Sequence, residues 1–164
     1  DGYDYAVWKG LNQFDPRIVI VEYNPTIPAN VVHIQDEIDQ SCFGNSLTAL
    51  WELGKEKDYR LVAITHTNAF FIRESECIQA DIKGYLPWEI KDERYETYIY
   101  HGYNGVLKLA GDQTLVWHGV KVSEDHVQVL PPGLRKIPVG QSAEFFRELD
   151  RFKHASEHEG SNSR

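Results

Sequence analysis

Pro16-Arg17-Ile18-Val19-Ile20-Val21-Glu22-Tyr23-Asn24-Pro25 is the most informative segment of this chain. Its four consecutive β-branched residues, with no polar residue among them, predict a strand that is buried on both faces. Such strands are typical of parallel sheets covered by helices. The run changes abruptly to Glu22, Tyr23 and Asn24, and in open α/β sheets ligands bind just outside the carboxyl ends of the strands. These polar residues are therefore the first functional candidates, with a simple Asn-Pro turn as the structural alternative.

The composition indicates a folded domain whose main partner is not nucleic acid. The chain has 164 residues, 41% of them hydrophobic and 12% aromatic, which is enough for one domain with a core. Its 25 acidic and 17 basic residues give a net charge of −8, whereas phosphate binding requires a concentrated positive surface. The sequence has no apolar run of the roughly 18 residues that a membrane helix needs, and no signal-peptide pattern. We interpret Cys42 and Cys77 as reduced thiols and expect a cytoplasmic protein.

Helical and strand patterns alternate in residues 1–75. In order, the predicted elements are a helix over residues 5–11 capped by Asp4, the strand over 16–22, a helix over 41–59 capped by Asn45 or Ser46, and strands over 60–67 and 69–73. The connection between the last two strands is too short for a crossover, so these strands are predicted to be antiparallel neighbours.

From residue 76 the pattern predicts a β-rich extension that ends in a short helix. Its predicted elements are a hairpin over residues 95–109 with an Asn-Gly turn, short strands over 117–122 and 127–130, and an amphipathic helix over 143–152. The polar end of the chain is predicted to be a disordered tail. The sequence thus divides into three predicted segments, 1–75, 76–152 and 153–164.

Five motifs follow one another in the first segment: Asp1-Gly2-Tyr3-Asp4-Tyr5, Val19-Ile20-Val21-Glu22-Tyr23-Asn24, Phe43-Gly44-Asn45-Ser46-Leu47, Tyr59-Arg60-Leu61-Val62 and Asn68-Ala69-Phe70-Phe71-Ile72-Arg73. Their order resembles the second half of a class I, Rossmann-like S-adenosylmethionine-dependent methyltransferase, most of all the FkbM-like and related methyltransferase-like proteins. In that family the fourth strand ends in an acidic turn and the fifth in Glu-Tyr-Asn. The resemblance implies an α/β fold: a partial Rossmann-like methyltransferase sheet of strands five, six and antiparallel seven with flanking helices, plus a small β-rich C-terminal extension.

The resemblance also implies S-adenosylmethionine as the cofactor of the full-length protein, with Asp1 and Gly2 at the cofactor. The family's glycine-bearing loop and its ribose-binding acidic residue belong to the first half of the fold, and neither precedes Asp1 here. The chain contains no methionine and opens directly on Asp1. We therefore expect a fragment that is inactive alone because the cofactor-binding half is absent.

Within this interpretation the chemistry falls to polar groups at the carboxyl edge of the sheet. The expected catalytic residues are Glu22, Asn24 and His66, since methyl transfer to a hydroxyl needs an oriented and deprotonated or polarised nucleophile. The expected substrate-binding residues are Tyr5, Tyr23, Phe43 and Asn45. For Tyr5 and Tyr23 a place in the core is the alternative, and for His66 a structural hydrogen bond is.

Metal binding is a weaker reading of the same residues. Asp1, Glu22 and Asn24 together would offer oxygen ligands that suit Mg²⁺, although helix capping explains Asp1 equally well. His101 and His118 form a second possible pair of ligands but lack a third at a telling spacing, so no metal ligand is assigned.

Two further functions compete with the enzyme. One is a non-catalytic binding or assembly module, in which an open sheet edge pairs with another chain and forms an oligomer. The other is a metal-dependent enzyme that uses the two histidines. The expected partner of the methyltransferase is a small-molecule or glycan substrate, without nucleic acid or membrane, and the sequence leaves the substrate's identity open.

Overall fold

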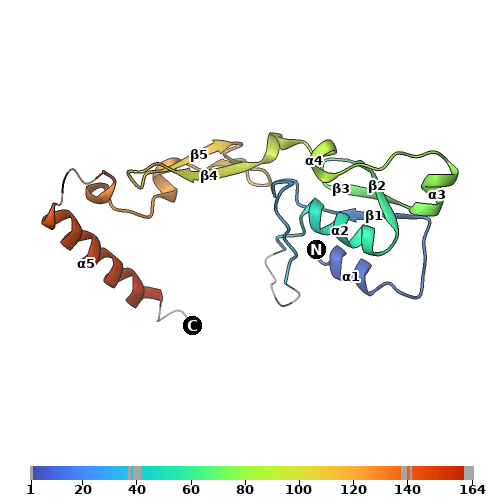
Figure 1. The fold of residues 1–164 in the computed structure, drawn as a ribbon, viewed down its shortest axis with the longest axis horizontal. Coiled ribbons are helices and arrows are strands. Elements are labelled where there is room, and N and C mark those ends of the chain that lie inside the picture. Colours follow the sequence, from blue (N-terminus) through green and yellow to red (C-terminus); the bar gives the residue numbers. More distant parts are fainter. Residues whose placement is uncertain (1, 37, 39–41, 138–139, 141, 161–164) are drawn as a thin grey trace. The chain divides into compact units, whose positions relative to one another are not determined.

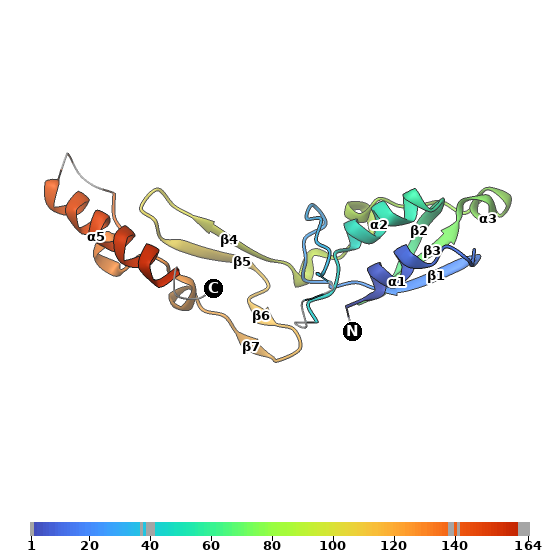
Figure 2. The same ribbon diagram turned by 90° about the horizontal axis from the view of Figure 1, so that it is seen from below.

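The structure is a computed structural model that describes residues 2–36, 38, 42–137, 140 and 142–160. It is a mixed α/β protein with small antiparallel sheets. The chain forms two compact units, Asp1–Glu96 and Thr97–Arg164 (Figures 1 and 2). The elements of the first unit are α1 (Asp4–Gly10), β1 (Ile18–Glu22), α2 (Leu47–Glu56), β2 (Tyr59–Ile64), β3 (Asn68–Arg73), α3 (Glu74–Gln79), α4 (Pro87–Ile90) and the 3₁₀ turn η1 (Glu93–Tyr95).

The first unit is built on a three-stranded sheet of order β1-β3-β2. The strand β3 is antiparallel to both of its neighbours, so β1 and β2 run in the same direction. The pairing of β2 with β3 through a short turn confirms the predicted antiparallel hairpin. The carboxyl ends of β1 and β2 consequently lie at one edge of the sheet, which is where the sequence analysis places functional residues.

The prediction that β1 is buried on both faces is wrong. Exposure alternates along the strand: Val19 and Val21 are buried, while Ile18 and Ile20 are 55% and 56% exposed. Its neighbour β3 is antiparallel, and β1 is an edge strand of the sheet that the described residues form. Because every residue of the run is apolar, the period of two that marks a half-buried strand is invisible in the sequence.

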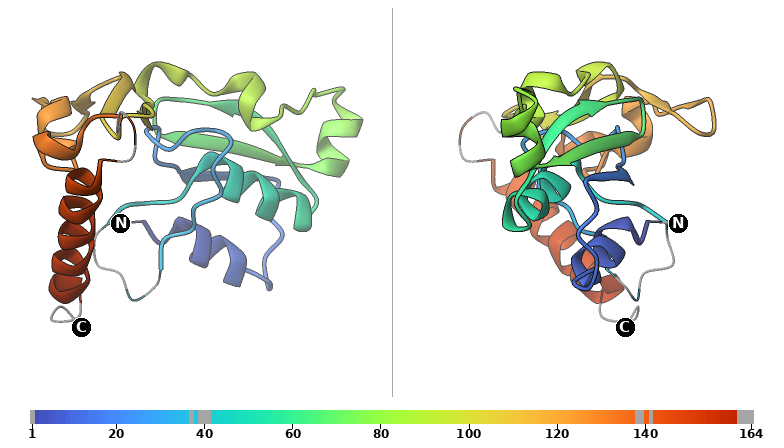
Figure 3. Two further views of the ribbon diagram at one scale, coloured as in Figure 1. Left: turned by 60° about the vertical axis from the view of Figure 1, so that its left-hand side comes forward. Right: turned by 90° about the vertical axis from the view of Figure 1, so that its right-hand side faces the viewer.

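One face of the sheet is covered by α1 and α2, which lie on the same side of it (Figure 3). The buried cluster between them contains Trp8, Val19, Val21, Tyr23, Leu47, Leu50, Leu53, Tyr59, Leu61, Ala69 and Phe71. Trp8 of α1 reaches the centre of this cluster, and its ring lies 4.7 Å from the ring of Phe71 and 5.8 Å from that of Tyr59. A single α1 side chain thus connects the helix layer to β2 and β3.

Both predicted helices begin at different residues from those expected. The N-cap of α1 is Tyr3 rather than Asp4, whose carboxylate instead accepts a hydrogen bond from the backbone amide of Glu22 at 3.2 Å. The helix α2 starts only after Ser46, the side chain of which accepts from the amide of Ala49 at 3.1 Å. Ser46 was one of the two predicted caps, and this hydrogen bond satisfies one of the orphan amides of the first turn.

The segment that follows β3 belongs to the first unit, although the sequence analysis ended its first segment at residue 75. It contains α3 and α4, neither of which was predicted. The amide of Tyr85 donates to the carbonyl of Leu61 at 2.8 Å, so the connection between these helices pairs with the outer side of β2. At α4, the Glu89 carboxylate accepts from the amide of Leu86 at 2.8 Å and caps the helix start.

The second unit contains two hairpins and a terminal helix. Its elements are β4 (Thr97–His101), β5 (Leu107–Gly111), β6 (Thr114–Leu115), β7 (Val120–Lys121), the 3₁₀ turns η2 (Glu124–Val127) and η3 (Pro132–Leu134), and α5 (Ala143–Gly160). The first predicted hairpin is confirmed, with β4 and β5 antiparallel. The strand predicted over 127–130 is absent from the described residues, where the turn η2 ends at Val127. Helix α5 continues beyond its predicted end, so residues 153–160 of the predicted disordered tail are helical.

Candidate functional site

A network of buried amide side chains joins the beginning of the chain to the carboxyl end of β1. Asn45 is 1% exposed, and its Nδ2 donates to the carbonyl of Gly2 at 2.9 Å. Its Oδ1 accepts from the amide of Gln35 at 2.9 Å, and Gln35 Oε1 in turn accepts from the amide of Gly44 at 2.6 Å. Gly2, predicted to lie at a cofactor, is therefore held against the loop that precedes α2.

The conformation of Gly2 explains why glycine is needed there. Its φ is +82°, and a Cβ atom at this position would lie 2.2 Å from Gln35 Oε1. The backbone of Gly2 thus approaches the Gln35 amide more closely than any other residue type allows. Asp1, the other predicted cofactor residue, lies outside the described residues.

Asn24 acts as a junction between the end of β1 and two loops. Its amide donates to the carbonyl of Asn45 at 2.9 Å, and its Nδ2 donates to the carbonyl of Phe43 at 2.8 Å. Its Oδ1 accepts from both the amide and the hydroxyl of Thr26, at 2.9 and 2.7 Å. Both Nδ2 and Oδ1 of the predicted catalytic residue Asn24 are thus hydrogen-bonded within the protein. Asn24 therefore positions the loops and the backbone around it.

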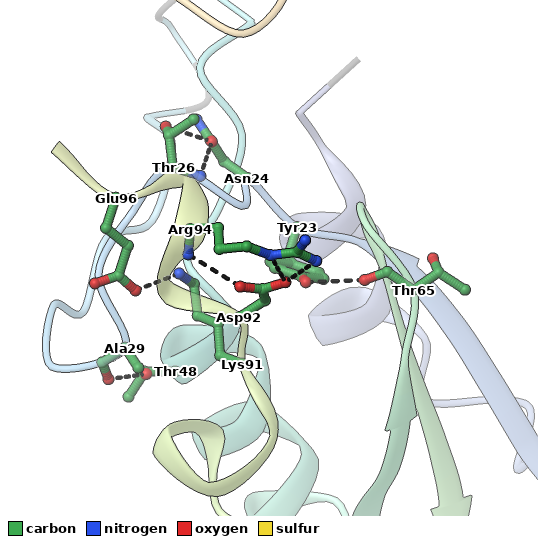
Figure 4. A network of polar contacts seen from close by, with 10 residues as sticks. All are labelled: Tyr23, Asn24, Thr26, Ala29, Thr48, Thr65, Lys91, Asp92, Arg94 and Glu96. Atoms are coloured by element: carbon green, nitrogen blue, oxygen red, sulfur yellow. Dashed lines mark hydrogen bonds and ion pairs between the residues drawn. The ribbon is translucent and has the colours of Figure 1, made fainter. Parts of the chain in front are cut away.

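Tyr23 lies in the core, which was the alternative to its predicted place in a substrate pocket. The side chain is 3% exposed, and its hydroxyl donates to the carbonyl of Thr65 at 3.0 Å (Figure 4). Burial, followed by the charges of Asp92 and Tyr95, raises the pKa of this phenol to about 12. The backbone amide of Tyr23 also donates to the carbonyl of Thr67 at 2.7 Å, so the residue fixes the end of β1 to the turn between β2 and β3.

Glu22 and His66 are the two predicted catalytic residues that remain accessible. Glu22 is the exposed last residue of β1, and His66 is exposed in the turn that follows β2. Because β1 and β2 run in the same direction, both residues lie at the carboxyl edge of the sheet. The His66 ring lies edge-on to the ring of Tyr95, with 4.4 Å between the centroids.

The remaining predicted substrate residues differ in accessibility. Phe43 is 51% exposed, and its ring lies 4.9 Å from the ring of His33. Tyr5 is partly buried and packs against the core, and Asn45 is fully enclosed. Of the four residues, Phe43 offers the largest free surface beside the carboxyl end of β1. His33, which supports it, has a buried Nε2 atom for which the described residues offer no hydrogen-bond partner.

A buried ion pair that the sequence analysis missed lies in the segment after α4. Lys91 Nζ and Glu96 Oε1 are 2.5 Å apart, and the two side chains are 1% and 2% exposed (Figure 4). The next pair in the segment, Asp92 with Arg94, is more exposed, and the hydrogen bond from Arg94 holds the pKa of Asp92 below its usual value. In the sequence these residues form an ordinary run of mixed charges, and no local signal separates the buried pair from the exposed one.

A groove of about 580 Å³ lies away from the predicted site. It is at the amino end of β2, whereas the predicted residues are at the carboxyl ends of β1 and β2. Its lining includes Trp51, Arg60, Glu74 and Tyr85. The guanidinium of Arg60 forms a two-point ion pair with Glu74, with Nε 2.6 Å from Oε2, so these two charged groups of the lining neutralise each other. The groove was not anticipated from the sequence.

Neither metal hypothesis gains a cluster of ligands from the structure. Within the described residues, no group of three or more His, Cys, Asp and Glu side chains is placed to hold a metal ion. His101 is the last residue of β4, and His118 lies in the turn between β6 and β7. None of the helices in the described part of the chain is both long and apolar enough to cross a lipid bilayer.

Comparison of the chain with known protein families, with curated proteins and with solved structures finds no match.

Proposed function

We propose that this chain is the substrate-side half of a Rossmann-like, S-adenosylmethionine-dependent methyltransferase that transfers a methyl group to a hydroxyl oxygen. The observation that carries the proposal is the place of residues 2–4 beside the carboxyl end of β1. Gly2 accepts a hydrogen bond from Asn45, and Asp4 accepts one from the amide of Glu22. In the family that the sequence resembles, the residues matching Asp1 and Gly2 end the strand preceding β1 and lie at the cofactor.

The directions of the strands also support the proposal. The resemblance expects strands five and six to be followed by an antiparallel strand seven, and β1, β2 and β3 have these directions. The helix α1, between residues 2–4 and β1, packs on the same face of the sheet as α2. In the proposed full-length fold, α1 would be the crossover helix between the preceding strand and β1.

The outer side of β1 provides a place for the strand that would precede it. Arg17 accepts from the amide of Arg73 at 3.1 Å, and Tyr23 donates to the carbonyl of Thr67 at 2.7 Å. The backbone N–H and C=O groups of the odd-numbered residues therefore point toward β3. Those of Ile18 and Ile20 point outward, away from β3. A parallel strand ending near Asp1 would pair with these groups and leave Glu22 at the border of the cofactor site.

In this proposal Glu22 and His66 are the acid–base candidates, because both are exposed at the edge where strand ends meet. Asn24 positions the loop that carries Phe43, and the exposed Phe43 ring would contact the substrate. S-adenosylmethionine would supply the methyl group, and its binding residues would come mainly from the part of the fold that precedes Asp1.

The proposal is tested by titrating S-adenosylmethionine, in a calorimeter, into this chain and into a protein extended upstream of Asp1 by its own coding sequence. The extended protein is expected to bind the cofactor and this chain alone to bind it weakly or not at all. Absence of binding to a folded extended protein would refute the methyltransferase. In the extended protein, Glu22→Gln should lower methyl transfer while cofactor binding persists, and Glu52→Gln on α2 is the matched control.

A second candidate function is a non-catalytic assembly module whose β1 edge takes a strand from another chain. It is favoured by the outward backbone groups of Ile18 and Ile20 and by the exposure of both side chains. Ile20→Pro removes one outward N–H without removing a hydrogen bond to β3. Light scattering after size exclusion should show a smaller species for this variant, and a wild-type monomer at every concentration would count against the module.

A further inference from the structure

The hairpin of the second unit has two edges that differ in how they are protected. The amide of Gly102 donates to the carbonyl of Val106 at 3.1 Å, which places these two residues in a hydrogen-bonded pair. In an antiparallel pair, residues an odd number of positions from Gly102 direct their backbone N–H and C=O groups away from β5. In β4 these residues are Thr97, Ile99 and His101. On β5 the same parity turns the backbone groups of Leu107 and Leu109 outward.

Side chains from η2 and the residue after it occupy the outward groups of β5. The Gln128 amide mimics a neighbouring strand, since its Oε1 accepts from the amide of Leu107 at 3.0 Å and its Nε2 donates to the carbonyl of Leu107 at 2.8 Å. Glu124 accepts from the amide of Leu109 at 3.5 Å and binds Lys108 Nζ at 2.6 Å. This edge is closed to strand addition.

The opposite edge has no such protection within the described residues. The sheet there has two strands, and β4 pairs only with β5. All five residues of β4 are exposed, Ile99 at 60% and Tyr100 at 54%. The strand contains no acidic residue, no lysine or arginine and no proline, the residues by which edge strands usually avoid pairing. A lone two-stranded hairpin is also only marginally stable, and additional strands stabilise it.

We propose that β4 pairs with β4 of a second copy of this chain, antiparallel and centred on Ile99, to form a continuous sheet of order β5-β4-β4-β5. This inference is independent of the proposed methyltransferase, because it uses only the second unit.

The edge is complementary to itself in this register. Ile99 faces Ile99 of the second copy, and Thr97 faces His101, so every outward N–H meets an outward C=O. Tyr98 lies opposite Tyr100 of the second copy in a non-hydrogen-bonded pair, where side chains approach most closely and aromatic pairs are favourable. No like charges come opposite one another, and the exposed Ile99 side chains cover each other. We therefore take the partner to be a second copy of this chain.

The first test compares single proline variants of the full chain by sedimentation equilibrium over micromolar to submillimolar concentrations. Ile99→Pro removes an outward N–H and keeps every hydrogen bond to β5, so it should make the protein monomeric. Ile20→Pro blocks the edge of β1 instead and should leave the dimer intact. A wild-type monomer throughout, or a dimer that Ile99→Pro does not weaken, overturns the proposal.

The second test uses the two-fold symmetry of the register. In Ile99→Lys or Ile99→Glu alone, like charges face each other, and dimerisation should weaken by about tenfold or more. An equimolar mixture of the two variants should recover dimers, because lysine then faces glutamate. Val129→Lys, at a 69% exposed site off the strand, should leave the dimer unchanged. A mixture that stays monomeric while each variant keeps its wild-type circular dichroism overturns the Ile99 register and with it the proposal.

Discussion

At the scale of single residues, the strongest constraints around the candidate site come from polar groups that are buried and fully engaged. Tyr23 has an apolar ring in the core and a hydroxyl bound to the carbonyl of Thr65. Such a phenol must stay protonated, because its ionised form would lose both the donated hydrogen bond and its hydration. The side-chain contact that holds the end of β1 to Thr65 therefore depends on the protonation of the Tyr23 hydroxyl.

Tyr23 should make the stability of the protein decrease at alkaline pH. The unfolded phenol ionises near its ordinary pKa of 10.0, whereas the folded pKa is raised to about 12. Between these values only the unfolded state loses the proton, so the contribution present below pH 10 is lost as the pH rises toward 12. Urea unfolding on both sides of this range should show a smaller decrease for Tyr23→Phe than for the wild type.

Tyr23→Phe should also cost about 1 kcal/mol at neutral pH, because the hydrogen bond to Thr65 is lost. Tyr103→Phe is the matched control, since Tyr103 is fully exposed and should affect neither quantity. An identical alkaline decrease in the wild type and in Tyr23→Phe would contradict the role assigned to the buried phenol.

The buried pair of Lys91 and Glu96 gives a second prediction. Replacing Lys91 removes the cation that faces the Glu96 carboxylate, in a site where both side chains are almost inaccessible. Lys91→Met should destabilise the protein by about 3 kcal/mol or more, whereas the double variant Lys91→Met/Glu96→Gln should recover a large part of the loss. Denaturant titrations of both variants measure this coupling, and equal stabilities of the single and double variants would disprove it.

At the scale of elements, the sequence predicted those helices and strands in which the apolar residues form a recognisable pattern. The helix α2 was predicted because Leu47, Leu50 and Gly54 repeat at helical spacing, and all three are buried. The short helices α3 and α4 were missed because their six and four residues are too few for a recognisable stripe. The β1 strand was found, but its environment was not, because partner strands decide which face of an all-apolar run is covered.

At Gly54 in α2, the packing of the core should outweigh the helix propensity of alanine. A Cβ atom there would lie 3.0 Å from the Phe71 ring and 3.2 Å from the Trp8 ring. Alanine is favoured over glycine inside a helix by about 1 kcal/mol, but overpacking a core typically costs about 1–3 kcal/mol. Gly54→Ala should therefore destabilise the protein, and Phe71→Leu should tolerate it better than the wild type does.

The comparison for this prediction is Gly10→Ala at the end of α1. Nothing lies within 4 Å of a Cβ atom at Gly10, so the substitution should be neutral or slightly stabilising. Thermal unfolding of the two alanine variants separates the effects, and a stabilised Gly54→Ala protein would show that the rings of Phe71 and Trp8 shift without cost.

At the scale of the whole molecule, the chain divides unevenly between its two units. The main buried cluster lies entirely within residues 1–96, while Leu109, Leu134 and Phe145 are the buried hydrophobic residues described in the second unit. A chain of residues 1–96 is expected to unfold cooperatively, with its own near-ultraviolet circular dichroism from Trp8. A non-cooperative transition of that chain would show that its core depends on the second unit.

The candidate site was predictable in part at this same scale. A strand pattern places each of Glu22 and His66 at the end of an apolar run, and both lie at one edge because β1 and β2 are each antiparallel to β3. The tertiary contacts around them were not predictable. Gln35 and Asn45 are ten positions apart, and no local sequence pattern encodes the hydrogen bond between them.

The Gln128 side chain sets a limit on growth. A sheet that can add chains at both edges grows without limit, so the mass of the assembly depends on nucleation and on time. Here a second copy joined through β4 would leave only two β5 margins, each already occupied by its own glutamine amide. Growth of this sheet would stop at two molecules, so its assembly would reach equilibrium without a lag and reverse on dilution.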